Sequence, residues 1–83
     1  MPNVRPVFYL RPETVEAVLD RHHLTHARLA QHLGISRSYF SQLVHRHRPV
    51  SRSTRRLLLD SRYLKGIPET ELWDVLSTPI RER

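Results

Sequence analysis

In the middle third of the chain, apolar residues recur three and four positions apart, in two blocks separated by a glycine. This spacing is typical of amphipathic helices, so it predicts one helix over residues 26–33 and another over residues 37–45. Each block follows a hydroxyl residue that can cap a helix, Thr25 or Ser36. Gly34 lies between the blocks, where an abrupt helix end needs positive φ. The pattern therefore predicts two short helices joined by a tight turn.

A hydrophobic staple is expected at the start of both helices. In such a staple, the apolar residue before the cap packs against the apolar residue at the fourth helical position. Leu24 and Leu29 form the first pair, and Ile35 and Phe40 form the second. Ala30 lies on the same inner side, where a small residue lets two helices cross closely. The expected core of this unit consists of Leu29, Ala30, Leu33, Ile35, Phe40 and Leu43.

The flanking sequence predicts three more helices and one extended segment. Pro12 and the acids after it suit the start of a helix, and Pro68 with Glu69 suits another. Ser51 can cap a helix that Gly66 closes. The expected helices cover residues 13–22, 52–64 and 69–76, with inner sides formed by Val15, Val18, Leu19 and His22, by Thr54, Leu57, Leu58 and Ser61, and by Leu72, Trp73, Val75 and Leu76. Val7–Leu10, bounded by prolines, can form a short strand.

A chain of 83 residues has room for one domain. The predicted elements divide it into an arm (1–11), a helical core (12–76) and a tail (77–83) without a core-forming pattern. We therefore expect an all-α fold of five helices, preceded by an arm that can form a short strand.

The charge is concentrated in the middle of the chain. The net charge is +6 and the pI is near 11.1. From Arg21 to Lys65 there are ten basic residues and a single acid, Asp60, whereas the other seven acids lie in the flanks. Such a distribution indicates a polyanionic partner and is typical of a nucleic-acid-binding surface.

Two overlapping segments resemble the helix-turn-helix of the phage-repressor-like family, also called Cro-like or XRE-type. They are LTHARLAQHLGIS, residues 24–36, and SRSYFSQLV, residues 36–44. The resemblance implies a lambda-repressor-like five-helix fold over roughly residues 13–76, with the second helix of the motif in the DNA major groove. Family members often have Gln at the position of His26, an acid at Val44 and a Gly near Arg46, so the end of the third helix and the role of His26 stay open.

The outer side of the third helix carries the side chains expected to contact bases. Arg37 can form two hydrogen bonds with guanine, and Gln42 can form two with adenine. Ser38 and Ser41 are short and can donate or accept a hydrogen bond, or let the helix lie deep in the groove. The resemblance places the usual base contacts on Arg37, Ser38 and Gln42, and Ser41 is added because it points outward.

Phosphate contacts are expected around this helix. His26 begins a helix, where the free N–H groups favour an anion. Tyr39 could bond a phosphate or could equally be a half-buried aromatic, and any of the basic residues could simply be solvated. The predicted phosphate-binding set is His26, Tyr39, His45, Arg46, Arg48, Ser51 and Arg52.

Other chemistry has no pattern in the sequence. The chain has no cysteine, and its six histidines lack the spacing of a metal site. No nucleophile triad or phosphate loop is present, so we expect no enzyme activity, metal, cofactor or small-molecule ligand. The sequence has no signal peptide and no apolar run of the roughly 20 residues that a membrane span needs. We therefore expect a cytoplasmic protein without a membrane partner.

These features predict a double-stranded-DNA-binding transcriptional regulator of the repressor type. The alternative is a helical protein-interaction module or antitoxin-like adaptor whose basic face meets an acidic protein. An RNA-binding protein would need exposed stacking aromatics, and Tyr9 and Tyr39 could serve. A homodimer on an inverted repeat is expected, because one recognition helix covers few base pairs. The favoured dimer surface is the fifth helix, with Ile67, Leu72, Trp73, Val75 and Leu76, unless Trp73 closes the monomer core; the other is Val7–Leu10, paired strand to strand.

Overall fold

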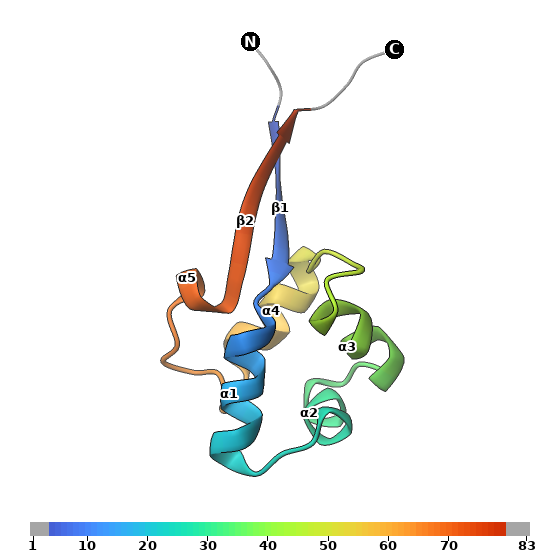
Figure 1. Ribbon diagram of the computed structural model, residues 1–83, viewed down its shortest axis with the longest axis vertical. Helices are drawn as coiled ribbons and strands as arrows, with labels where there is room; N and C mark the ends of the chain where they lie inside the picture. Colours follow the sequence, from blue (N-terminus) through green and yellow to red (C-terminus); the bar gives the residue numbers. More distant parts are fainter. Residues whose placement is uncertain (1–3, 80–83) are drawn as a thin grey trace.

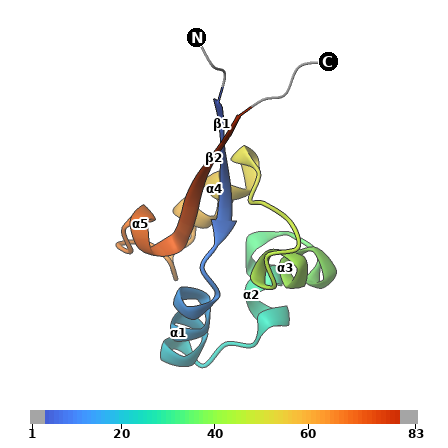
Figure 2. The ribbon, with the colours of Figure 1, turned by 45° about the horizontal axis from the view of Figure 1, so that its top comes forward.

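The computed structural model of the chain describes residues 4–79. Within these residues five helices gather around a core, and two strands form a ribbon that projects from it (Figures 1 and 2). The elements are β1 (Val4–Leu10), α1 (Pro12–His22), α2 (His26–Leu33), α3 (Arg37–Val44), α4 (Arg52–Asp60), α5 (Glu69–Leu72) and β2 (Trp73–Pro79). Among the helices in residues 4–79, none combines the length and the apolar character needed to cross a membrane.

The expectation of an all-α fold is wrong, because the two ends of the described chain form an antiparallel sheet. β1 pairs with β2 from Val4 opposite Pro79 to Leu10 opposite Trp73. The strand expected in the arm is therefore present and longer than predicted. The fifth helix stops at Leu72, and the start of the predicted tail belongs to β2. Residues 80–83 of that tail and residues 1–3 of the arm lie outside the described residues.

The C-terminal strand forms where the sequence suggested a helix. A short segment that is apolar apart from one acid, Asp74, is compatible with either conformation. Trp73 leaves the helical region, with φ −148° and ψ 157°. Pairing with β1 places Trp73 opposite Leu10, and both side chains are buried. The Trp73 ring also meets Phe8 edge to face, with 6.2 Å between the ring centroids. The long-range pairing therefore decides the conformation of this segment.

The predicted turn between two short helices is confirmed. Thr25 Oγ1 accepts the N–H of Arg28 at 3.1 Å, and Ser36 Oγ accepts the N–H of Tyr39 at 3.0 Å. Gly34 ends α2 with φ at 78°. Leu24 and Ile35, the outer members of the two predicted staples, pack against the core, as do other partly buried apolar residues. The local sequence signals thus define α2, the turn and α3.

The fourth helix is shorter than predicted, since it ends at Asp60 and not at residue 64. The reason lies in Ser61, whose buried hydroxyl accepts the N–H of Tyr63 at 3.3 Å. A serine that bonds the backbone in this way competes with the helical hydrogen bonds. The chain then turns through residues 62–66, and Gly66 adopts positive φ at the end of the turn.

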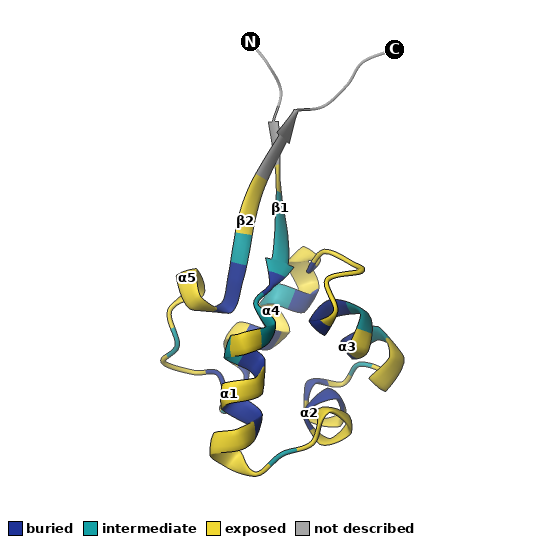
Figure 3. Cartoon of the chain, in the orientation of Figure 1, coloured by how far each residue is buried: buried dark blue, intermediate teal, exposed yellow. Residues whose placement is uncertain are grey.

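The core lies between the helices and the base of the ribbon (Figure 3). The predicted inner residues of α1, α2 and α3 are buried, apart from His22, which is exposed, and Ile35, which is half-buried. Leu57 was expected to be internal, but 42% of it is exposed. The buried apolar residues are Leu10, Val15, Val18, Leu19, Leu29, Ala30, Leu33, Phe40, Leu43, Val44, Val50, Leu58, Leu64, Leu72 and Trp73.

Candidate nucleic-acid interface

The base-contacting residues predicted from the sequence lie together on α3. Phe40, Leu43 and Val44 are buried and fix one side of this helix against the core. On the other side Arg37, Ser38 and Ser41 are exposed and Gln42 is half-buried. The side chains of Arg37, Ser38 and Gln42 form no hydrogen bond with any other residue in the described part of the chain. This face of α3 therefore offers polar groups that are available to a ligand.

A chain of hydroxyl groups connects α3 to the start of α4. Tyr39 is half-buried, and its hydroxyl lies 3.0 Å from Thr54 Oγ1. Ser51 caps α4 by accepting the N–H of Thr54, and its hydroxyl donates to Thr54 Oγ1 at 2.9 Å. The N-terminus of α4 is thereby held beside α3. Tyr39 has the half-buried position that the sequence left open, and its phosphate contact stays a prediction.

Arg48 and Arg52 flank this connection. The Arg48 guanidinium lies over the ring of Tyr39, 5.8 Å from the ring centroid. Arg52 is exposed at the first position of α4, where the helix dipole and free N–H groups favour an anion. Neither arginine forms an ion pair with a carboxylate among the described residues. Their charges are thus available beside Tyr39 of α3 and at the N-terminus of α4.

His26 has a protein partner that the sequence did not suggest. Its Nε2 lies 2.7 Å from a carboxylate oxygen of Glu16 on α1, and both side chains are about half exposed. A phosphate at the N-terminus of α2 would therefore have to displace or share this contact. The pair borders a hollow of about 210 Å³, lined by Glu16, His26, Arg37, Ser41, Val44 and His45.

The segment after α3 is tied to the ribbon by Arg46. Its guanidinium donates to a carboxylate oxygen of Asp74 on β2 at 2.8 Å and lies 5.5 Å from the ring centroid of Tyr9 on β1. Arg46 adopts φ of 60°, a conformation that residues other than glycine seldom take. The predicted phosphate contact of Arg46 would compete with Asp74.

His45 also uses one of its nitrogens within the protein. It caps the C-terminus of α3, and its Nδ1 donates to the carbonyl oxygen of Ser41 at 2.8 Å. The Ser41 hydroxyl lies 3.3 Å from the same nitrogen. The ring is exposed, so the other nitrogen can face a ligand.

Asp74 has an altered acidity because two arginines surround it. The hydrogen bond from Arg46 holds the pKa of Asp74 below its ordinary value, and the nearby charge of Arg11 lowers the pKa further. Arg11 Nε lies 3.6 Å from Asp74 Oδ1. Asp74 therefore stays ionised, and holds both arginines, to a lower pH than an ordinary carboxyl group would.

Sequence reasoning missed the partners that position these residues. The bond of Thr54 to Tyr39 spans 15 positions, that of Glu16 to His26 spans 10, and that of Asp74 to Arg46 spans 28. No motif of neighbouring residues indicates such contacts. The same holds for Arg55, which was counted only as a basic residue: its guanidinium lies 3.7 Å from the ring centroid of Phe8, and it donates to the carbonyl of Val50.

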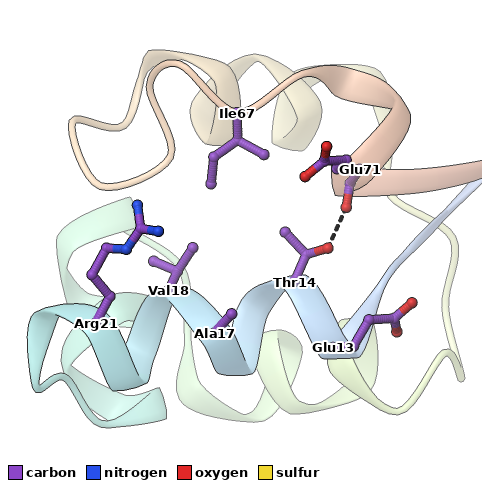
Figure 4. A pocket seen from close by; sticks show the side chains of 7 residues that line it. All are labelled: Glu13, Thr14, Ala17, Val18, Arg21, Ile67 and Glu71. Carbon is purple, nitrogen blue, oxygen red and sulfur yellow. Dashed lines mark hydrogen bonds between the residues drawn. The ribbon is translucent and has the colours of Figure 1, made fainter.

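A second hollow, of about 250 Å³, lies between α1 and the segment that leads into α5 (Figure 4). Acidic side chains stand at one end and Arg21 at the other, with apolar side chains from Val18 and Ile67 between them. The hydroxyl of Thr14 donates to the carbonyl oxygen of Glu71 and joins the two walls. Among residues 4–79, no buried side-chain nitrogen or oxygen lacks a hydrogen-bond partner. No polar group of this hollow therefore marks it as a ligand site.

The described residues hold no group of three or more histidines and carboxylates that could bind a metal ion. Comparisons of the chain with protein-family models, with curated proteins and with solved structures gave no significant match. The assignment of a function must therefore start from the geometry of α3 and from the residues around it.

Proposed function

We propose that this protein is a sequence-specific regulator of transcription, of the repressor type, that binds double-stranded DNA with α3 in the major groove. The observation that carries the proposal is the outer face of α3. This face carries the side chains of Arg37, Ser38, Ser41 and Gln42. The capped turn and the buried opposite side of the helix fix its orientation, and three of the four side chains have no hydrogen-bond partner in the described protein. Such a face can form hydrogen bonds with base edges.

The phosphate contacts in this proposal come from the residues around α3. Arg48 and Arg52 carry the largest share, because neither is paired with a carboxylate in the described chain. Ser51 and Tyr39 hold the N-terminus of α4 in place through Thr54, and the free N–H groups of a helix N-terminus favour a phosphate. His26, His45 and Arg46 contribute less, since each already has a protein partner.

The proposed DNA complex is two-fold symmetric. One α3 helix covers only a few base pairs, so specificity calls for a second copy one helical turn away, about 34 Å along the DNA. The target would then be an inverted repeat. The proposal also implies a cytoplasmic protein, in a cell whose DNA lies in the cytoplasm.

Salt dependence of DNA binding tests the proposal. Fluorescence anisotropy with a random duplex should show affinity falling steeply with salt, because bound phosphates release counterions. Arg52→Ala should flatten the slope of log K against log salt by about one unit. Lys65→Ala is the matched control, since it removes the same charge from an exposed turn on the opposite side from α3 (Figures 1 and 2). Binding without salt dependence, or equal slopes for the two variants, would contradict the proposal.

A further inference from the structure

The two edges of the ribbon differ in which peptide groups they expose. At the base of the ribbon the N–H of Arg11 donates to the carbonyl of Leu72 at 2.9 Å. Hydrogen-bonded pairs alternate along an antiparallel ladder, so the peptide groups of Tyr9 and Val7 face β2, and those of Phe8 and Pro6 face away. The carbonyl of Phe8 agrees with this, because it accepts the N–H of Val50 at 2.6 Å.

The outer edge of β1 is closed to another strand. The carbonyl of Phe8 is already bonded to Val50, and Pro6 has no N–H to donate. A proline and a covering segment are two of the ways in which proteins protect an exposed strand edge. Pairing with a further strand on this side is therefore blocked.

The outer edge of β2 is open. By the same alternation the peptide groups of Val75 and Ser77 face away from β1. At the start of β2, the N–H of Trp73 donates to the carbonyl oxygen of Glu69. Beyond that point no strand among residues 4–79 lies beside this edge. Val75 is 54% exposed and Leu76 is 49% exposed, which leaves apolar side chains on both faces of the open strand.

We propose that a second copy of this chain pairs with the outer edge of β2, antiparallel and with the two-fold axis at Leu76. Val75 then faces Ser77 of the second copy in a hydrogen-bonded pair. Leu76 meets the same residue of the second copy at a non-hydrogen-bonded position, where opposing side chains are closest. The product is a four-stranded sheet in the order β1-β2-β2-β1.

The pattern of charge supports a second copy as the partner. No charged residue occurs from Val75 to Pro79, although the chain as a whole carries +6. An acidic partner or a nucleic acid would find no cation on this strand. Two like-charged copies, by contrast, can associate through an uncharged surface. In a two-fold interface the same strand of each copy forms the contact.

The closed edge of β1 supports a dimer of defined size. Pairing stops at four strands because both outer edges of the resulting sheet are then β1 edges. Open growth into fibres, the usual hazard of an exposed strand, is prevented. Of the surfaces considered from the sequence, the proposal keeps Val75 and Leu76. Leu72 and Trp73 are buried in the monomer, and Val7–Leu10 already pairs with β2.

This inference deepens the proposed function, because it supplies the surface for the two-fold DNA complex. Its tests use no DNA, so the dimer and the DNA-binding proposal can fail separately. Edge pairing alone buries a small area, and we expect a weak dimer in free solution that an inverted repeat reinforces.

Disulfide formation tests the position of the axis. The chain has no cysteine, so a single substitution introduces a unique thiol. Under mild oxidation Leu76→Cys should form covalent dimers about ten-fold or more faster than Val75→Cys, since residues that meet across a two-fold axis lie within disulfide reach. Val75 is the matched control because it is equally exposed, is adjacent in sequence and points to the opposite face. Equal rates, or no crosslinking of Leu76→Cys, would overturn the proposal.

Sedimentation equilibrium tests the hydrogen bonds of the edge. Val75→Pro removes an N–H that faces away from β1 and should raise the dimer dissociation constant about ten-fold or more, while Val75→Thr keeps the N–H and should change it little. Circular dichroism verifies that the variants stay folded. A parent chain that is monomeric at all concentrations, or equal constants for the two variants, would overturn the proposal. If Val75→Pro fails to fold, the cysteine pair decides alone.

Discussion

The turn from α2 to α3 and the ribbon of β1 and β2 are built by different kinds of interaction. In the turn, helix caps join residues three positions apart, such as Thr25 with Arg28 and Ser36 with Tyr39. In the ribbon, Val4 pairs with Pro79 at the other end of the chain. The comparison shows that the proposed DNA-contacting helix is specified locally, whereas the proposed dimer surface exists only after the whole domain has folded.

The two regions are nevertheless coupled. Arg46 follows α3 directly and holds Asp74 on β2, and the ring of Tyr9 on β1 lies against the same guanidinium. The ribbon therefore fixes the chain at the end of α3. In a two-fold complex this contact would help to set the spacing between the two α3 helices.

The largest expected effect comes from truncating a large buried side chain in either region. Phe40 is fully buried in α3 and Trp73 is 2% exposed at the base of β2. Phe40→Ala and Trp73→Ala should each lower the free energy of unfolding by about 3–5 kcal/mol in urea denaturation. Leu76→Ala, at a half-exposed position of the same strand, should cost far less. If Trp73→Ala left the stability unchanged, the ribbon would not belong to the same cooperative unit as the helices.

A smaller effect is expected from the turn itself. Gly34 has φ at +78°, and a Cβ added there would meet no heavy atom within 4 Å. The cost of Gly34→Ala therefore comes from the backbone and should be about 1–2 kcal/mol in thermal or urea unfolding. Gly66→Ala, at φ of +92° and with equally free space, should cost a similar amount. A neutral Gly34→Ala would mean that the chain turns elsewhere.

The smallest expected effect is the pH dependence of the contact between the two regions. Arg46 lowers the pKa of Asp74 in the folded protein. The ion pair therefore stabilises the fold at pH values above 3.8, the ordinary pKa of this carboxyl group. That stability is lost as the pH falls through the lowered pKa. Asp74→Asn should therefore weaken the fold near neutral pH and show a shallower loss of stability between about pH 5 and pH 2. Glu69→Gln, at an exposed acid of α5, serves as control; identical pH profiles for parent and Asp74→Asn would contradict the account.

The sequence predicted the elements whose signals are local. The caps at Thr25, Ser36 and Ser51 each bond the N–H three residues on, and Gly34 has the positive φ expected of it. The outward position of Arg37 follows from the helical period once those ends are known. The base-contacting face could therefore be placed from residues 24–45 alone.

What the sequence could not predict depends on residues far apart. The segment from Leu72 to Leu76, which is apolar apart from Asp74, fits a helix as well as a strand, and no local pattern indicates its pairing with β1. The partner of Arg46 is 28 positions away, so this arginine was assigned to phosphate without its carboxylate. A half-buried position for Tyr39 was one of the two that the sequence left open. No local pattern indicated the bond between its hydroxyl and Thr54, which joins α3 to α4.

The central claim is that side chains of α3 contact DNA bases. Selection of bound sites from a random duplex library, carried out with the parent, Arg37→Ala and Gln42→Ala, tests it most directly. The account predicts an inverted repeat for the parent. Each variant should lose preference at one base pair per half-site and about 1–3 kcal/mol of specific affinity, with a smaller change in non-specific binding. Recovery of the parent's full site preference by either variant, or no enriched site for the parent, would contradict the claim.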